Sequence, residues 1–334
     1  MNRIKAKMNF NKNKIIYLIA FLAIVVALPL IIKDNYVIYI INMCMIYSIV
    51  ALSINLIVGF SGQLDFGRAA FVGLGGYSSA LMMMQLGFPF LVAFLASGLF
   101  CAFVGFVLGS LCRKSTFDYL TLITIGFNVI CNLVFLNWHD VTGGAMGIRR
   151  VPSPEIFGFK FDTSASFFYL ALVILILSFI AIKFIIRSKW GRAFEALRDD
   201  PIAASYSGIR VADYKVLAFT IGSFFTGIAG SLLVHFTNYA NPSNYTLDES
   251  IYELQMAILG GLGSLPGSIV GTILLWVGPE ISRGFYQYRL LFVGILMVVL
   301  MIWAPNGLLG KNGIGERIIG LRRFISKKRP GGNK

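Results

Sequence analysis

The chain has 334 residues, of which 57% are hydrophobic and 13% charged, and it carries a formal net charge of +14. Its mean hydropathy is +0.77. Soluble domains are less apolar and about 25% charged, so these values exclude a soluble enzyme, a disordered chain and a disulfide scaffold. They also exclude a nucleic-acid binder inferred from net charge, because the basic residues lie in blocks between apolar runs. The composition leaves a polytopic membrane protein.

Ten apolar runs are the predicted membrane segments, since a helix needs about 20 apolar residues to cross a hydrocarbon core of about 30 Å. In chain order they cover residues 15–32, 37–60, 69–86, 88–112, 116–136, 164–187, 215–238, 249–262, 267–282 and 289–305. The eighth run is short, and the ninth carries Pro279 and Glu280 near its end. These two runs are alternatively a re-entrant pair beside eight spans. Either way, the predicted fold is an all-α, polytopic bundle of membrane helices.

The distribution of basic residues orients this bundle. A basic N-terminus, residues 1–14, precedes the transmembrane domain at 15–305, and a basic tail follows at 306–334. With the N-terminus inside, only six of the 29 lysines and arginines lie outside, namely Lys33, Arg149, Arg150, Lys160, Arg283 and Arg289. Because lysine and arginine are enriched in cytoplasmic loops, we expect a multi-pass protein of the cell membrane with both termini cytoplasmic. Loop 137–163 then faces out and loop 188–214 faces in.

The inward loop 188–214 is predicted to form two short helices on the cytoplasmic face. An amphipathic helix starts near Gly191, Pro201 breaks it, and Gly208 ends the second piece. Together they would make a docking surface with charges that complement a partner. The charged residues of this surface are Arg192, Glu195, Arg198, Asp199 and Asp200. A solvated connector is the alternative.

No motif indicates catalysis, a cofactor or a metal site. The glycine-rich stretch 260–267 lacks the Lys-Ser/Thr of a phosphate-binding loop, and a tight turn between membrane segments accounts for its glycines. His139 and His235 are far apart in the sequence, and no zinc-binding spacing is present. The GxSxG nucleophile motif is also missing. We therefore expect neither an enzyme nor a metal-binding protein.

One acidic residue lies well inside an apolar run. Glu253 follows Glu249 by about one helical turn. A charge buried in a membrane helix costs about 2.5–3.5 kcal/mol on the insertion scale. Glu253 is therefore either part of a polar cavity wall or an interfacial residue of a helix that begins later, and both interpretations stay open.

Four stretches share their order and spacing with a known family. They are SGQLDFGRAAF from Ser61 to Phe71 followed by GGY at 75–77, TGGAMGI from Thr142 to Ile148, GRAFEALRDDPIAASYSGI from Gly191 to Ile209, and LGGLGS from Leu259 to Ser264 followed by Pro266-Gly267. Together they resemble the permeases of ABC importers of the branched-chain amino acid type, most closely the LivM-type subunit. The resemblance covers roughly residues 35–310. Asp65 and Arg68 depart from it, because family members commonly have a small polar residue and a histidine there, and this difference bears on which solute is carried.

The resemblance implies one subunit of a larger importer. Family members lack ATPase activity of their own and pair in the lipid bilayer with a second, homologous permease. Two cytoplasmic ATPase subunits drive the pair, and an extracytoplasmic substrate-binding protein delivers the solute. Loop 191–209 is then the segment that couples to the ATPases. Its candidate coupling residues are the five charged residues above together with Gly191, Ala196, Ala204 and Gly208.

Candidate residues along the solute path follow from the chemistry that an amino acid requires. A zwitterionic amino acid needs donors for its carboxylate and acceptors for its amine, and exposed backbone at two glycine-rich stretches would supply them. The path candidates are Gly62, Gln63, Glu253, Gly260, Gly261 and Gly263. The alternative is that the glycines serve turns alone. The outer-loop motif, whose candidates are Thr142, Gly143 and Gly144, faces the opposite side.

Two other functions fit the same sequence features. The same architecture would serve an importer of urea, short amides or another small polar solute. An ion-coupled secondary transporter acting alone is a different class, which usually shows more acidic residues within the membrane or ion sites at broken helices. No cofactor and no nucleic acid is expected as a partner.

Overall fold

The computed structural model describes residues 34–113 and 117–281, with shorter pieces at 26, 28–29, 32, 294–295, 297–299, 302 and 307–310. The predicted segments 15–32 and 289–305 lie largely outside these residues. The basic N-terminus at 1–14 lies wholly outside them, and so does the basic tail after residue 310.

Helices make up nearly all of the described chain. The long ones are α2 (Asn35–Ile54), which continues into the π-helix η1 (Asn55–Phe60), α4 (Phe90–Leu111), α5 (Phe117–Asn137), α7 (Ser164–Arg187) and α10 (Val211–Thr237). The shorter ones are α3 (Arg68–Met84), α11 (Leu247–Gly260) and α12 (Leu265–Ile281). These elements coincide with eight of the ten predicted runs, so the prediction of an all-α bundle is confirmed for the part of the chain that the structure describes.

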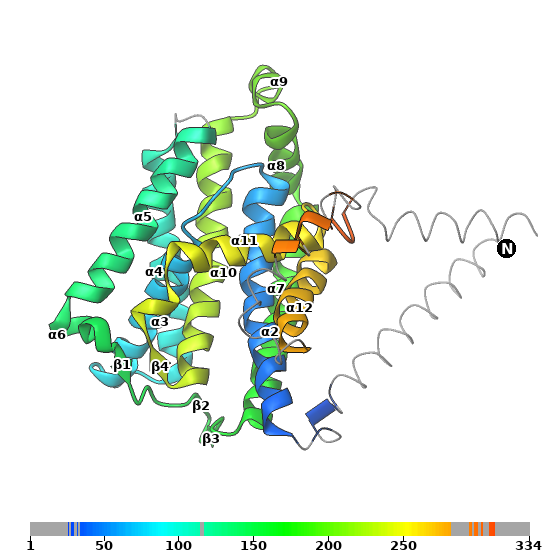
Figure 1. Cartoon of the computed structure of the whole chain (residues 1–334). Coiled ribbons are helices and arrows are strands. Elements are labelled where there is room, and N and C mark those ends of the chain that lie inside the picture. Colours follow the sequence, from blue (N-terminus) through cyan, green and yellow to red (C-terminus); the bar gives the residue numbers. More distant parts are fainter. Residues whose placement is uncertain are drawn as a thin grey trace, which may run out of the picture.

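Five helices are long and apolar enough to cross a membrane: the α2–η1 unit, α4, α5 (from Tyr119), α7 and α10. The 14 residues of α11 give a helix about 21 Å long, which is shorter than the hydrocarbon core of about 30 Å. Figure 1 shows α11 lying across the middle of the bundle rather than along its length. The described part of the chain is thus a helical membrane protein by length and composition, and α11 is too short to cross the hydrocarbon core as a single straight helix.

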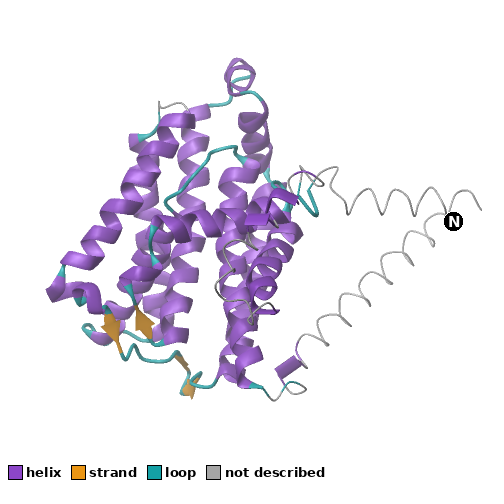
Figure 2. Cartoon of the chain, in the orientation of Figure 1, coloured by secondary structure: helices purple, strands orange, loops and turns teal. Residues whose placement is uncertain are grey.

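The two ends of the bundle differ in structure (Figures 1 and 2). At one end two short helices, α8 (Lys189–Asp199) and α9 (Pro201–Tyr206), project beyond the long helices. The opposite end carries the short helix α6 (His139–Thr142), the 3-10 helices η2 (Gly144–Met146) and η3 (Pro242–Asn244), and two small antiparallel sheets. The sheets pair β1 (Ile148–Arg149) with β4 (Tyr239–Ala240) and β2 (Glu155–Ile156) with β3 (Phe159–Lys160). Loops 188–214 and 137–163 therefore lie at opposite ends.

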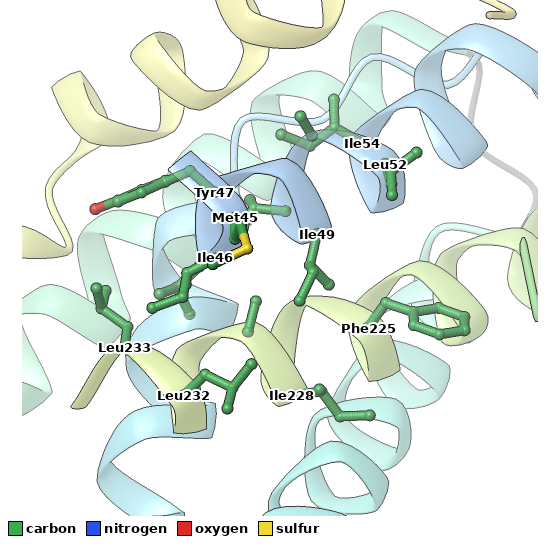
Figure 3. Close-up of a cluster of buried hydrophobic side chains, with 14 of the residues drawn as sticks. Met45, Ile46, Tyr47, Ile49, Leu52, Ile54, Phe225, Ile228, Leu232 and Leu233 are labelled. Atoms are coloured by element: carbon green, nitrogen blue, oxygen red, sulfur yellow. The ribbon is translucent and has the colours of Figure 1, made fainter. Parts of the chain in front are cut away.

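The core forms where α2 packs against α10. Ile46 and Ile49 of α2 lie against Ile228 and Leu232 of α10, and these side chains are almost fully buried (Figure 3). In the most apolar stretch of each helix, 78% of residues are buried for α2–η1 and α10, against 28% for α5 and α7. Helices that are apolar on all sides but only partly covered by protein are suited to contact lipid. The bundle thus has two central helices and a lipid-facing periphery.

Small residues let α3 and α4 approach α10 closely. A Cβ added at Gly75 of α3 would lie 2.6 Å from the Cα of Gly227, and one added at Gly105 of α4 would lie 2.6 Å from the Cβ of Ser223. Without a hydrophobic driving force between helices in lipid, such close packing is a main source of helix association. It fixes α3 beside α10, which positions the residues described next.

Candidate functional site

The helix α8 is amphipathic and seated on the end of the bundle. Its N-cap is Ser188, whose hydroxyl accepts a hydrogen bond from the backbone N–H of Trp190 at 3.1 Å. Phe194 and Leu197 on one face are fully buried, whereas Arg192 on the other face is exposed. The prediction of an amphipathic helix that begins in this loop is therefore confirmed.

A sharp break separates α8 from α9. The carboxylate of Asp200 accepts hydrogen bonds from the backbone N–H groups of Ile202 and Ala203 at 2.9 and 3.0 Å, and Pro201 occupies the first turn of α9. Gly208 follows the second helix with a φ of +82°, which favours glycine. The sequence signals at Pro201 and Gly208 thus mark the ends that the structure shows.

The remaining predicted coupling residues are distributed between the two faces of this segment. Gly191 has no room for a side chain, because an added Cβ would overlap the backbone of Ile186. Ala204 is buried, Glu195 and Ala196 are half-buried, and Asp199 and Asp200 are exposed. At the tip of α9, Ile202 and Tyr206 are 69% and 88% exposed. The segment therefore presents both charged and apolar side chains outward.

Arg198 ties α8 to η1, at the end of the α2–η1 unit. Its Nη1 donates a hydrogen bond to the backbone carbonyl of Gly59 at 2.9 Å, and its Nε and Nη2 donate to the carboxylate of Asp199 at 3.1 and 2.8 Å. The side chain lies against Gly62, where an added Cβ would be 2.9 Å from the Cγ of Arg198. Gly62 has a φ of +74°, so glycine is favoured there on two grounds.

The second glycine-rich stretch meets the same place. Asn55 of η1 is fully buried, and its side chain accepts from the N–H of Gly263 at 2.7 Å. Its Nδ2 donates to the carbonyls of Gly261 and Ser264 at 3.2 and 3.0 Å and to the hydroxyl of Ser268 at 2.6 Å. An added Cβ at Gly263 would be 3.5 Å from the Nη1 of Arg198. Three motifs far apart in the sequence thus converge on one locus, which we call the glycine-turn junction: residues 55–63, 198 and 260–264.

Backbone groups of the glycine-turn junction are already in use. The N–H groups of Gly62 and Gln63 donate to the carbonyls of Val58 and Ile57 at 3.1 Å each. The carbonyl of Gly260 accepts from the N–H of Leu309 at 3.0 Å. The Gln63 side chain is buried and donates to the hydroxyl of Ser61 at 2.7 Å and the carbonyl of Lys215 at 3.3 Å. These bonds favour the interpretation of the glycines as turn residues over one in which they contact solute.

Glu253 lies apart from this junction. Since α11 begins at Leu247, Glu253 is inside the helix, and it is only 2% exposed. The interpretation of a helix that begins later, with Glu253 at the interface, is therefore wrong. It interacts electrostatically with Glu249, one turn earlier on α11, and with Arg68 and Asp65.

Asp65 and Arg68 form a buried ion pair that the sequence alone did not identify as a site. After η1, loop 61–67 leads back into the bundle, so that α3 begins in its interior with Arg68 (Figure 1). The Nε of Arg68 pairs with the Oδ2 of Asp65, and both residues are at most 1% exposed. The other Asp65 oxygen accepts from the N–H of Gly67 at 2.8 Å. We call Asp65, Arg68 and Glu253 the buried charge cluster.

The outer-loop motif makes a turn at the other end. Thr142 is buried, and its hydroxyl donates to the carbonyls of Phe135 and Trp138 at 2.8 and 2.7 Å. Gly143 and Gly144 follow with φ angles of +76° and +60°. The motif therefore shapes the path of the chain from α6 into η2, far from α8 (Figure 1).

Comparison with known proteins gives independent evidence on the family of this chain. Residues 36–304 match the family described as branched-chain amino acid transport system / permease component. The chain belongs to this family. This confirms the family that the four sequence motifs indicated.

Individual relatives carry the same kind of name. The high-affinity branched-chain amino acid transport system permease protein LivM of Escherichia coli K12 is 37% identical over 317 residues, covering 88% of this chain and 74% of LivM. LivH of Salmonella typhimurium LT2, a permease protein of the same named system, is 26% identical over 285 residues, covering 79% of this chain and 91% of LivH. A probable LivM of Methanocaldococcus jannaschii is 23% identical over 321 residues, covering 80% and 92%. No solved structure matches the chain.

Proposed function

We propose that the chain is a LivM-type permease subunit of an ATP-binding-cassette importer for branched-chain amino acids. It forms the path through the cell membrane with a second, homologous permease, and separate cytoplasmic ATPase subunits drive the pair. An extracytoplasmic binding protein delivers the solute. Membership in the permease family supports this, as does the similarity to both LivM and LivH, which fits a pair of related permeases.

The observation that carries the proposal is the seat of α8 on the glycine-turn junction. One face of α8 is buried against the bundle, and Arg198 bonds it to the carbonyl of Gly59 at 2.9 Å. α8 follows α7 directly, and α10 follows α9 after four residues. A force on α8–α9 therefore reaches two membrane-crossing helices and two glycine turns, as a lever for a separate motor requires.

The exposed tip of α9 is the part of this lever that we assign to the ATPase subunit. Ile202 and Tyr206 expose apolar surface there, and Arg192 and Asp199 add charges nearby on α8. Interfaces of this kind combine apolar anchors with a charged rim. In this proposal the α8–α9 end faces the cytoplasm and loop 137–163 faces out, with both basic ends of the chain inside.

Co-purification tests the assignment. The chain is tagged and co-expressed with the second permease and the ATPase subunits, and the ATPase recovered per permease is measured. We expect the double substitution I202D/Y206D to abolish recovery of the ATPase. The matched control is F157D, which changes an apolar side chain that is fully exposed at the opposite end. Full recovery with I202D/Y206D would contradict the docking role.

Uptake assays separate the proposal from its competitors. Vesicles that contain the complete transporter should accumulate leucine when ATP and the binding protein are supplied. Accumulation of urea or a short amide in place of leucine would support the importer architecture but show that the proposed solute is wrong. Accumulation by the chain alone, driven by an ion gradient, would replace the whole mechanism.

A further inference from the structure

The buried charge cluster lies where several helices meet inside the bundle. Asp65 comes from the loop before α3, Arg68 from the first turn of α3, and Glu253 from the middle of α11. Five fully buried polar side chains of α2, α5, α10 and α11 bond to Arg68, to the backbone of Phe66 or Ala69, or to one another. They are Ser53, Thr124, Asn128, Thr226 and Ser250. Charges at such a place are costly in a membrane protein and usually mark a path or a binding site.

Most groups of Arg68 have a partner. Nε pairs with Asp65, and Nη1 donates to the hydroxyl of Thr226 at 3.4 Å. The centre of the guanidinium lies 4.6 Å from the ring centroid of Phe71 and 4.8 Å from that of Phe219. Nη2 is buried and has no hydrogen-bond partner among the described residues. The guanidinium is thus held firmly on several sides with one donor group left over.

Glu253 has a buried carboxylate oxygen, Oε2, that lacks a hydrogen-bond donor among the described residues. Glu253 interacts electrostatically with Arg68, yet no ion pair joins the two in the described part of the chain. The cluster itself therefore holds two carboxylates against one guanidinium, and Glu249 adds a third carboxylate one turn before Glu253. One donor and one acceptor on separate helices have no partner among the described residues. Unsatisfied charged groups of this kind cost several kcal/mol, so they call for a partner.

We propose that the buried charge cluster binds the head group of an α-amino acid as it passes, with Nη2 of Arg68 donating to the carboxylate and Oε2 of Glu253 accepting from the ammonium. This inference rests on the proposed function and adds the residues and the chemical class of the ligand. A planar guanidinium is well matched to a carboxylate. The ammonium supplies the positive charge that the second carboxylate lacks. Urea and neutral amides have no charge to offer either group.

The geometry also assigns Asp65 a separate role. Both of its oxygens are engaged, one by Arg68 and one by the N–H of Gly67 at 2.8 Å. Asp65 therefore holds the guanidinium in place at the start of α3 and is a positioning residue. The hydroxyl of Ser250, three residues before Glu253, accepts from the N–H of Ala69 at 2.9 Å, which fixes α11 against α3. Both sides of the proposed site are thus anchored to each other.

A variant of Glu253 tests the proposal in the complete transporter. The chain is co-purified with the second permease and the ATPase subunits, reconstituted in vesicles and supplied with leucine-loaded binding protein. We expect E253Q to co-purify with its subunits and to lose leucine uptake by about tenfold or more, since a charge-assisted hydrogen bond is removed. The matched control is D248N, which removes an exposed carboxylate from the first turn of the same helix and should leave uptake unchanged. Uptake by E253Q within about twofold of the wild type would overturn the proposal.

A measurement on the wild type keeps the test independent of folding defects in variants. The thermal unfolding midpoint of the purified complete transporter is recorded without the binding protein, in excess leucine, leucinamide or 4-methylpentanoate. Leucinamide lacks the carboxylate and 4-methylpentanoate lacks the ammonium, so we expect only leucine to raise the midpoint. Equal stabilisation by either analogue, or none by leucine, would overturn the proposal.

Failure of this inference is distinct from failure of the proposed function. If the wild-type transporter shows no ATP-driven leucine uptake, the proposed function itself is wrong. If the wild type is active while E253Q is equally active, the permease assignment stands and only the head-group site is lost.

Discussion

Two arginines of this chain illustrate different uses of the same side chain. Arg198 sits at the edge of the bundle with its side chain 28% exposed, and it bonds the carbonyl of Gly59 and the neighbouring carboxylate of Asp199. Arg68 is fully buried, paired with Asp65, and keeps one donor group without a partner in the described structure. The first arginine closes a structural junction, whereas the second remains available for a ligand.

The surroundings of the two arginines also differ in whether their polar groups have hydrogen-bond partners. At the glycine-turn junction, Asn55 alone makes four hydrogen bonds that satisfy turn and helix groups. In the buried charge cluster, the unpartnered groups are an arginine nitrogen and a glutamate oxygen. A fully satisfied polar network makes a structure rigid, whereas an unpaired buried polar group is costly until it gains a partner. The junction is thus suited to transmit motion, and the cluster to recognise solute.

The largest effect is expected from breaking the buried ion pair. Arg68→Met leaves the carboxylate of Asp65 buried without its partner, which we expect to destabilise the protein by about 3–5 kcal/mol. The measurement is thermal unfolding of the purified transporter in detergent. The double variant D65N/R68M removes both charges and should recover part of the loss. A single variant as stable as the double one would show that the pair is not buried as described.

A smaller loss of stability is expected at the junction. Asn55→Leu removes four hydrogen bonds between η1 and the turn around Gly261, which we expect to cost about 2 kcal/mol. The matched control is Asn42→Leu on the preceding helix, where the side chain is equally buried but makes one hydrogen bond within the described residues, to the carbonyl of Ser164 at 2.8 Å. Equal unfolding midpoints for the two variants would contradict a special role for Asn55.

Coupling should respond to Arg198 more than stability does. Arg198→Ala removes the bond to the carbonyl of Gly59, and we expect leucine uptake per ATP hydrolysed to fall about fivefold, equivalent to one hydrogen bond of about 1 kcal/mol. The control is Arg210→Ala, whose side chain is 86% exposed and pairs only with Asp213 at 3.4 Å among the ion pairs of the described residues. An unchanged ratio of uptake to hydrolysis in Arg198→Ala would separate the junction from transport.

The smallest effect is expected at an exposed ion pair on the same end of the bundle. Arg113 and Asp213 approach to 2.5 Å, but their side chains are 54% and 39% exposed. Pairs in such positions contribute about 0–1 kcal/mol. Asp213→Asn should therefore leave the unfolding midpoint and uptake almost unchanged. A loss as large as that of Asn55→Leu would show that this pair is less accessible to water than its exposure indicates.

Much of the fold could be predicted because membrane helices are encoded locally. Apolar runs gave eight helices to within a few residues, and Pro201 and Gly208 marked the break and end of the α8–α9 pair. The family followed from motifs whose order is a property of the sequence itself. The eighth run is short in the sequence, and its helix α11 is correspondingly too short to cross the membrane alone.

The buried charge cluster could not be predicted because it depends on the path of the chain. The family pattern relates Asp65 and Arg68 to the choice of solute but does not show that they pair with each other. Their burial depends on loop 61–67 returning into the bundle. The bond from Arg198 to Gly59 joins residues 139 positions apart. The apolar run 37–60 contains two asparagines, Asn42 and Asn55, and the sequence does not say which turn the side chain of Asn55 holds.

The most direct test of the central claim is leucine uptake into vesicles that contain the complete purified transporter. ATP is supplied on the side of the membrane that carries the ATPase subunits, and the binding protein on the opposite side. We predict that leucine accumulation continues when ionophores abolish all ion gradients. Accumulation that is independent of ATP and stops with the ion gradient would contradict the account.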